Sequence, residues 1–193
     1  PTALRLPVEA ICQRARSAGI LTIVDAAHSP GQIPVDLQAM GADIVFGNCH
    51  KWMLAPKGAG FLYVRPEIQP LIHPLVVSWG YRPTPESTTG SRFLDLLQWT
   101  GTKDPAAALT VPAAIGFMND HHWEEVRGQC HNLLRGAMER ICALTDMPPC
   151  YPLDSDFYSQ MGIAPLPRSH LVALKTRLYD EYKIEVPLIE WQT

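Results

Sequence analysis

Two clusters of polar residues follow short apolar runs in the first third of the chain. The first cluster comes after residues 20–24, and the second comes after residues 43–46. The side chains in them that could do chemistry are Asp25, His28, Asn48, His50 and Lys51. Carboxylates, imidazoles and amines act as general acids, general bases and nucleophiles in enzymes. The spacing therefore predicts one catalytic site that is built from two neighbouring strand ends.

These residue types match what a protein must supply to pyridoxal 5'-phosphate (PLP). A lysine forms a Schiff base with the cofactor, and an acid beside the pyridine nitrogen keeps that nitrogen protonated. Lys51 and Asp25 suit these two roles and are the predicted catalytic residues. His28 suits the position beside the ring hydroxyl, while Asn48 and His50 can donate to the phosphate. No metal ligand is predicted among them.

Taken singly, each of these residues has a plainer interpretation. An aspartate after a strand caps a turn about as often as it acts in catalysis. Lys57 competes with Lys51 for the cofactor, but its Gly-Pro turn context favours a solvated lysine. The prediction therefore rests on the combination of residues, in which Lys51 is the preferred amine.

The elements that would position these residues follow an α/β order. A helix over 7–18 precedes the apolar run 20–24, and a short helix near 36–40 precedes the run 43–46. Apolar runs without polar alternation are typical of parallel strands covered on both faces. Ligands bind beyond the carboxyl ends of such strands, where both polar clusters fall.

The rest of the chain predicts a third strand, a long ordered loop and a helical region. The expected elements are a strand at 61–64, the loop at 70–102, a helix at 105–118 kinked at Pro112, a second helix at 123–144, a strand at 161–166, a helix at 169–182 and an edge strand at 184–188. Residues 1–104 would then belong to a large domain and residues 105–193 to a small C-terminal domain.

Three segments resemble the class V aminotransferase family of fold-type I PLP enzymes, and within it the isopenicillin N epimerase-like branch. They are Val24-Asp25-Ala26-Ala27-His28, Gly47-Asn48-Cys49-His50-Lys51-Trp52 with the following Ala55–Leu62, and Trp99-Thr100-Gly101-Thr102-Lys103-Asp104. Cysteine desulfurases of the family usually have Gln at the His28 position and Ser at the Asn48 position. This chain therefore resembles the epimerase-like branch more closely.

The resemblance implies a fold and a role for each matching residue. The fold would be the C-terminal part of the PLP-binding large domain, with a mostly parallel sheet, followed by a small α/β domain that is incomplete. Asp25 would pair with the pyridine nitrogen, His28 would lie by the ring hydroxyl, and Lys51 would hold the cofactor. Asn48 and His50 would contact the phosphate. Gly101-Thr102 would reach the neighbouring subunit's phosphate in a homodimer, so Thr102 is also a cofactor-binding residue.

Composition limits the class of partner. The net charge of −3 and the 18% of charged residues give no basic stripe for nucleic acid or an anionic membrane. No apolar run approaches the roughly 20 residues that span a bilayer. Five cysteines without a C-x-x-C pair predict reduced thiols, with neither a disulfide framework nor a zinc site. We therefore expect a cytoplasmic protein with a small-molecule substrate.

The first residue, Pro1, is not an initiator Met and directly precedes a helical pattern. The family's upstream half and its C-terminal arginine, which grips the substrate carboxylate, have no counterpart in these 193 residues. We therefore expect the chain to be a part of a longer protein.

The leading hypothesis is an isopenicillin N epimerase-like enzyme that acts at Cα of an amino acid or an amino-acid-derived substrate. Lys51 would be the general base, and Tyr81 and Arg82 are candidates for substrate contact. A cysteine lyase or desulfurase is the alternative enzyme, although a desulfurase needs an exposed reactive cysteine, and only Cys150 lies in a loop. The third alternative is a truncated chain without catalytic activity.

Overall fold

The computed structural model describes residues 2–190 of the chain. The chain divides into two compact units between Cys130 and His131, inside a long helix. One unit comprises Arg5–Cys130, and the other comprises Pro1–Leu4 with His131–Thr193. All of the candidate site residues belong to the first unit, which is described first.

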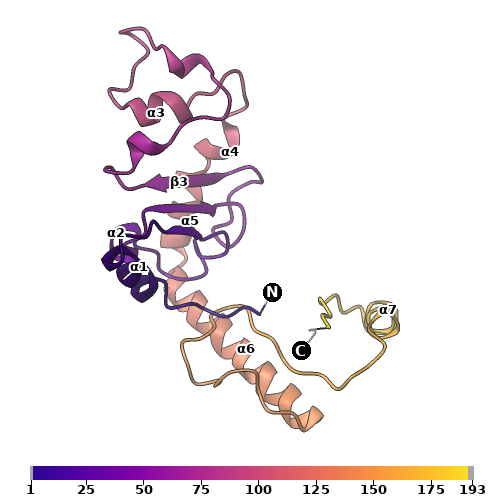
Figure 1. Cartoon of the computed structure of the whole chain (residues 1–193). Coiled ribbons are helices and arrows are strands. Elements are labelled where there is room, and N and C mark those ends of the chain that lie inside the picture. The colour runs from indigo at the N-terminus through magenta and orange to yellow at the C-terminus, as the bar shows by residue number, and fades with distance from the viewer. Residues whose placement is uncertain (1, 191–193) are drawn as a thin grey trace. The chain divides into compact units, whose positions relative to one another are not determined.

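A three-stranded sheet lies in the first unit, in the order β1-β2-β3 (Figure 1). The strand β1 (Ile23–Asp25) pairs in parallel with β2 (Ile44–Asn48), and β2 pairs antiparallel with β3 (Gly60–Val64). Asp25 is in register with Phe46, so β1 and β2 run toward the same edge of the sheet. Both polar clusters therefore emerge at one edge, as the sequence predicts.

One face of this sheet packs against the first two helices. Those helices are α1 (Val8–Ser17) and α2 (Leu37–Met40). Cys12 of α1 and Met40 of α2 form a buried cluster with Val45 of β2, which is fully buried. Because side chains alternate along a strand, the odd-numbered residues of β2 face these helices, while Ile44, Phe46 and Asn48 face the other way.

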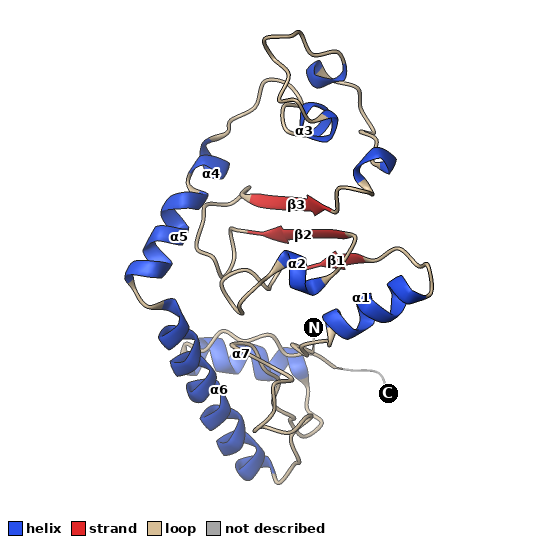
Figure 2. Cartoon of the chain, turned by 90° about the vertical axis from the view of Figure 1, so that its left-hand side faces the viewer, coloured by secondary structure: helices blue, strands red, loops and turns tan. Residues whose placement is uncertain are grey.

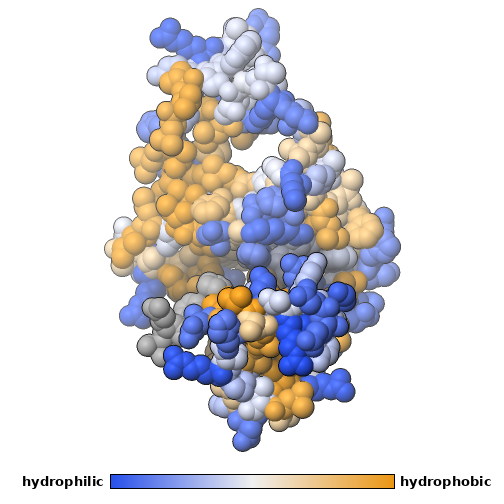
Figure 3. Space-filling model, turned by 90° about the vertical axis from the view of Figure 1, so that its right-hand side faces the viewer, coloured by the Kyte–Doolittle hydropathy of each residue, from blue (hydrophilic) through white to orange (hydrophobic). Residues whose placement is uncertain are grey.

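The opposite face of the sheet is exposed in the part of the chain that the structure describes. Ile23, Phe46 and Leu62 have 65%, 41% and 46% of their surface exposed. Continuous apolar runs predict strands covered on both faces. Within residues 2–190 helices cover one face of this sheet, and cover of the second face stays a prediction for the whole protein. Large exposed apolar side chains also occur elsewhere, and Figure 3 shows continuous hydrophobic areas on the surface.

The segment 70–102 is ordered but is not wholly a loop. It contains most of η1 (Gln69–Leu71), all of η2 (Trp79–Tyr81) and the helix α3 (Arg92–Leu97), which the sequence analysis missed. The Ser91 hydroxyl accepts a hydrogen bond from the backbone N–H of Leu94 and so caps α3.

The helical region after this segment is interrupted where the sequence predicts a kink. The helix α4 (Ala106–Leu109) ends at Thr110, and α5 (Val111–Asp120) begins with Pro112 in its first turn. Proline fits the first turn of a helix because its missing N–H has no intrahelical partner there. The interruption near Pro112 is confirmed.

The second unit contains the C-terminal part of α6 (Trp123–Thr145) and the helix α7 (Leu171–Tyr182) (Figure 2). Met138 of α6 packs against Tyr151 and Tyr158, whose rings stack 5.3 Å apart. This cluster forms the core of the unit.

The predicted strands at 161–166 and 184–188 are wrong. Backbone groups in these segments bond to partners other than a strand: the N–H of Ile163 donates to the Tyr151 hydroxyl, and the N–H of Ile184 donates to the carbonyl of Leu178 and closes α7. A strand requires a ladder of hydrogen bonds to a neighbouring strand, and neither segment forms a strand within residues 2–190. No helix in that range is long and apolar enough to cross a membrane.

Candidate active site

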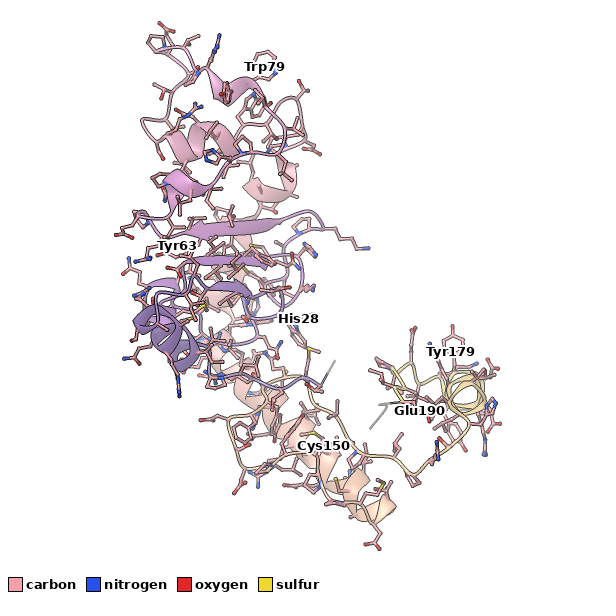
Figure 4. All side chains as sticks on the ribbon, viewed as in Figure 1. His28, Tyr63, Trp79, Cys150, Tyr179 and Glu190 are labelled. Atoms are coloured by element: carbon pink, nitrogen blue, oxygen red, sulfur yellow. The ribbon has the colours of Figure 1, made fainter. Side chains whose placement is uncertain are left out.

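Lys51 and His28 lie side by side at the edge of the sheet where β1 and β2 end. Lys51 Nζ is 3.1 Å from His28 Nε2. The indole Nε1–H of Trp52 donates to His28 Nδ1 at 3.2 Å. Figure 4 labels His28 in the loop that follows β1. Two adjacent residues of the second loop therefore contact both nitrogens of one imidazole in the first loop.

Gly31 allows these two loops to approach each other. Its φ of +83° is a conformation that favours glycine, and a Cβ at this position would lie 2.3 Å from the carbonyl oxygen of Trp52. The indole N–H of Trp123 donates to the Gly31 carbonyl at 2.9 Å. A glycine and a distant tryptophan thus fix the first loop against the turn that carries Lys51.

The turn that carries Lys51 has its own buried base. The N–H of Cys49 donates to the Ala59 carbonyl at 3.0 Å, and the N–H of Ala55 donates to the Cys49 carbonyl at 3.0 Å. Cys49, Ala55 and Ala59 form a buried cluster against residues of α4 and α5. The Lys51 backbone is therefore held at both ends of a closed loop.

Asp25 has the plainer role of a turn cap. Its Oδ1 accepts the N–H of Ala27 at 2.9 Å, so the carboxylate caps the turn after β1. The pleat also places Asp25 on the same face of the sheet as Asn48. The turn cap fixes the direction of this carboxylate at the edge where β1 ends.

Charges around His28 act on it in opposite directions. Partial desolvation lowers the pKa of His28, and the positive charge of Lys51 lowers it further, whereas the Asp25 carboxylate raises it. The net effect is a pKa below the ordinary value of 6.5. His28 is therefore mostly neutral at pH 7.

His50 has a constrained hydrogen-bonding role. Its Nδ1 lies 3.0 Å from the carbonyl oxygen of Ala59. Because a carbonyl only accepts hydrogen bonds, Nδ1 carries the proton. Nε2 of a neutral His50 then has a lone pair, so His50 can donate to a phosphate only as an imidazolium.

The other predicted residues have no described contact with Lys51 or His28. Thr102 is exposed in the loop between α3 and α4, and Lys57 is exposed in the turn before β3. Tyr81 packs under the guanidinium of Arg92, 5.1 Å from the ring centroid, and Arg82 is exposed. The described contacts of these residues do not join them to Lys51.

The cysteines offer no activated thiol beside the site in the part of the chain that the structure describes. Cys49 is buried, and burial raises its thiol pKa, which disfavours the nucleophilic thiolate. Cys150 is exposed, but it belongs to the second unit.

Sequence reasoning missed the supporting residues Trp52, Gly31 and Trp123. Trp52 belongs to one of the three family-like segments but had no predicted role, and Gly31 was interpreted only as a turn residue. The signal for Gly31 was its place in Ser29-Pro30-Gly31 directly after the first polar cluster. The hydrogen bond of Trp123 joins residues 92 positions apart, so no local pattern indicates it.

The side chains present fit PLP. The Lys51 amine and the His28 imidazole are in contact, and the charge of the Asp25 carboxylate acts on that imidazole. This cofactor requires an amine for covalent attachment, an acid for the ring nitrogen and a donor for the ring hydroxyl.

The chain is similar to known proteins along nearly its whole length. It is 34% identical to the isopenicillin N epimerase of Amycolatopsis lactamdurans over 98% of this chain and 50% of that protein. It is 31% identical to putative L-cysteine desulfhydrase 2 of Oryza sativa subsp. japonica, over 97% of this chain and 40% of that protein.

A solved structure shares the fold. The apo structure of the cysteine desulfurase from Thermococcus onnurineus NA1 matches with a TM-score of 0.76 at 22% identity, over 95% of this chain and 46% of that one. The chain thus spans about half the length of the proteins it matches. The fold is the C-terminal part of a fold-type I PLP enzyme. The family model described as "Aminotransferase class-V" matches residues 3–184, and the chain therefore belongs to the class V aminotransferase family.

Proposed function

We propose that the whole protein is a PLP-dependent enzyme that acts at Cα of an amino acid or an amino-acid-derived substrate. The observation that carries the proposal is the contact of 3.1 Å between Lys51 Nζ and His28 Nε2 at the edge where β1 and β2 end. The family implies PLP as the cofactor. Bound PLP supplies an electron-accepting ring that stabilises negative charge at Cα.

The residues of this chain would divide the work between them. The Lys51 amine would hold the cofactor, and as a free amine it would take the proton from Cα of the substrate. The Asp25 carboxylate would keep a proton on the pyridine nitrogen, and His28 would donate to the ring hydroxyl. Asn48 and a protonated His50 would contact the phosphate.

The domain organisation and assembly are part of the same proposal. Residues 1–104 would belong to the PLP-binding large domain and residues 105–193 to the small C-terminal domain. Thr102 is exposed and has no described contact with Lys51, which suits a residue that reaches the site of a second subunit. We therefore propose a homodimer. We also propose that the protein is located in the cytosol.

A matched pair of lysine variants tests the cofactor assignment. In the whole protein, Lys51→Ala should abolish the visible absorbance of bound PLP, because it removes the attachment point. Lys57→Ala should retain that absorbance, since Lys57 lies in an exposed turn. A colourless wild-type protein contradicts the proposal and favours a chain without catalytic activity. Unchanged absorbance in Lys51→Ala contradicts the assignment of Lys51 as the attachment point.

Isotope exchange separates epimerisation from the alternatives. The substrate class is proposed from the relative named isopenicillin N epimerase. Incubation of candidate amino acids in heavy water should place deuterium at Cα of recovered substrate, without loss of the amine or side chain. Release of sulfide and ammonia from cysteine would instead indicate a lyase. The rice relative is named as a putative L-cysteine desulfhydrase. A lyase of this kind needs no activated cysteine.

A further inference from the structure

A cavity of about 570 Å³ lies in the first unit, between the chain that follows β3 and the helix α3. The residues that line it come from 66–81 and 91–96, and none belongs to the loops that carry His28 and Lys51. A cavity of this volume is large enough for a small organic molecule. Its apolar walls include Ile72, Pro74, Val77, Phe93 and Leu96.

The elements around this cavity are held together by backbone contact and by Arg92. A Cβ at Gly80 would lie 1.4 Å from the carbonyl oxygen of Asp95, so η2 and α3 approach each other through their backbones. Arg92 Nη1 donates to the carbonyls of Gly80 and Tyr81, at 3.1 Å and 2.7 Å. The guanidinium also lies over the Tyr81 ring, 5.1 Å from its centroid. These contacts fix the orientation of Arg92 beside the cavity.

The positive charge of Arg92 has no ion-pair partner within residues 2–190. No carboxylate from that range lines the cavity. The Asp95 carboxylate interacts with the Arg92 charge, but its oxygens already accept hydrogen bonds from Thr88 and Thr89. The bonds to the two carbonyls use Nη1, so the N–H groups on Nη2 and Nε have no described partner. The geometry of such N–H groups matches the two oxygens of a carboxylate.

We propose that this cavity binds a small monocarboxylate with an apolar body, which places its carboxylate on Arg92 and its body against the apolar walls. A monocarboxylate matches the single charge of the guanidinium. A phosphate monoester brings about −1.5 to −2, which would leave an excess negative charge beside apolar side chains. The hydroxyls of Tyr81 and Ser91 and the imidazole of His73 also line the cavity and can donate to an anion.

Two features favour binding at this place. Its contacts already orient Arg92, so the side chain loses little freedom when a ligand binds. The apolar walls lower the local dielectric constant, which strengthens the hydrogen bonds of the guanidinium. The site requires neither PLP nor Lys51, so the inference goes beyond the proposed function.

Methyl NMR of the whole protein tests the proposal, with hexanoate and 4-phenylbutyrate as probes and their neutral amides as matched controls. A carboxylate should bind with saturation and shift the methyl signals of Ile72 and Val77. Those of Val172, which is exposed in the second unit, should stay unchanged. The amides should bind about tenfold more weakly, because they leave the guanidinium unpaired.

Three results of these titrations would overturn the proposal. They are equal affinities for a carboxylate and its amide, the absence of saturable shifts at Ile72 and Val77 with both carboxylates, and tighter binding of inorganic phosphate than of either carboxylate.

Arg92→Gln and Arg14→Gln form a matched pair. Both arginines are exposed in the first unit, but Arg14 belongs to α1 and does not line the cavity. Arg92→Gln should weaken carboxylate binding about tenfold and leave amide binding unchanged, whereas Arg14→Gln should alter neither. Unchanged carboxylate binding in Arg92→Gln would contradict the proposal.

If Arg92→Gln does not fold, the comparison of carboxylate with amide in the wild type still decides the question. Failure of PLP to bind Lys51 would overturn the proposed function and leave the carboxylate result intact.

Discussion

The loops at the sheet edge and the segment 70–102 are both long connections, but they are stabilised in different ways. The loops after β1 and β2 contact each other through side chains that lie more than 20 residues apart, such as His28 with Lys51 and Trp52. The segment 70–102 is held mainly by local bonds: buried Asp95 accepts hydrogen bonds from the Thr88 hydroxyl and from the hydroxyl and N–H of Thr89.

This difference separates the proposed catalytic framework from a self-contained segment. Contacts between two loops fix the relative positions of an amine, an imidazole and a carboxylate, which catalysis requires within a fraction of an ångström. Local contacts order a segment without placing it against Lys51. Changes in the first region should therefore affect cofactor binding, and changes in the second should remain local.

Gly31→Ala should have the largest effect. The new Cβ would lie 2.3 Å from the Trp52 carbonyl oxygen at a positive φ, which costs roughly 3 kcal/mol of folding free energy. We expect PLP binding to be lost together with stability, as measured by visible absorbance and chemical denaturation.

Gly19→Ala is the control, because Gly19 also has a positive φ, +69°, but open space around it. Gly19→Ala should cost about 1 kcal/mol of folding free energy and leave PLP bound. Equal effects of the two variants would contradict the claim that Gly31 is needed for the close approach of the two loops.

Asp43→Asn should weaken the sheet beneath the loops. Burial alone would raise the pKa of Asp43, but hydrogen bonds from Thr22 and the Arg65 guanidinium outweigh burial and hold the pKa below its ordinary 3.8. The ionised carboxylate therefore stabilises the fold above pH 3.8, and this stability is lost as the pH falls through the lowered pKa of the folded state. The variant should lose about 2 kcal/mol near pH 7.

Denaturation of wild type and Asp43→Asn across pH 2–7 checks this linkage. The difference between them should shrink as the pH falls below 4. A difference that stays constant with pH would show that the Asp43 charge contributes nothing.

Trp123→Phe should loosen the first loop by a smaller amount. It removes the N–H that donates to Gly31 at 2.9 Å and keeps an aromatic ring. Loss of one such bond costs about 1 kcal/mol, so PLP affinity should fall by roughly fivefold at most, measured by titration of the apo protein. An unchanged affinity would mean that this bond does not support the site.

Asp95→Ala should have the smallest effect on the site. It removes the acceptor for Thr88 and Thr89, so trypsin should cleave several-fold faster after Arg92 while PLP absorbance at Lys51 stays unchanged. Loss of absorbance would show that the segment 70–102 takes part in the site of the same chain.

The sequence predicted this arrangement unevenly, for physical reasons. Apolar runs ending in polar clusters predicted β1, β2 and the common edge that holds Asp25 and Lys51, because a helix between two successive strands lets them run in parallel. The strands expected at 161–166 and 184–188 failed since strand formation depends on a distant neighbour, which local apolarity does not reveal. The contact of Trp52 with His28 and the approach of Gly31 to Trp52 depend on how two loops pack, so only the structure shows them.

The central claim is that PLP is attached to Lys51, and borohydride reduction tests it most directly. Reduction of the wild-type protein with bound PLP fixes the cofactor on the amine that holds it, and peptide mass mapping then identifies that amine. The account predicts a pyridoxyl group on the peptide that contains Lys51 and none on Lys57. A pyridoxyl group on Lys57 or another lysine, or none on any peptide, would contradict it.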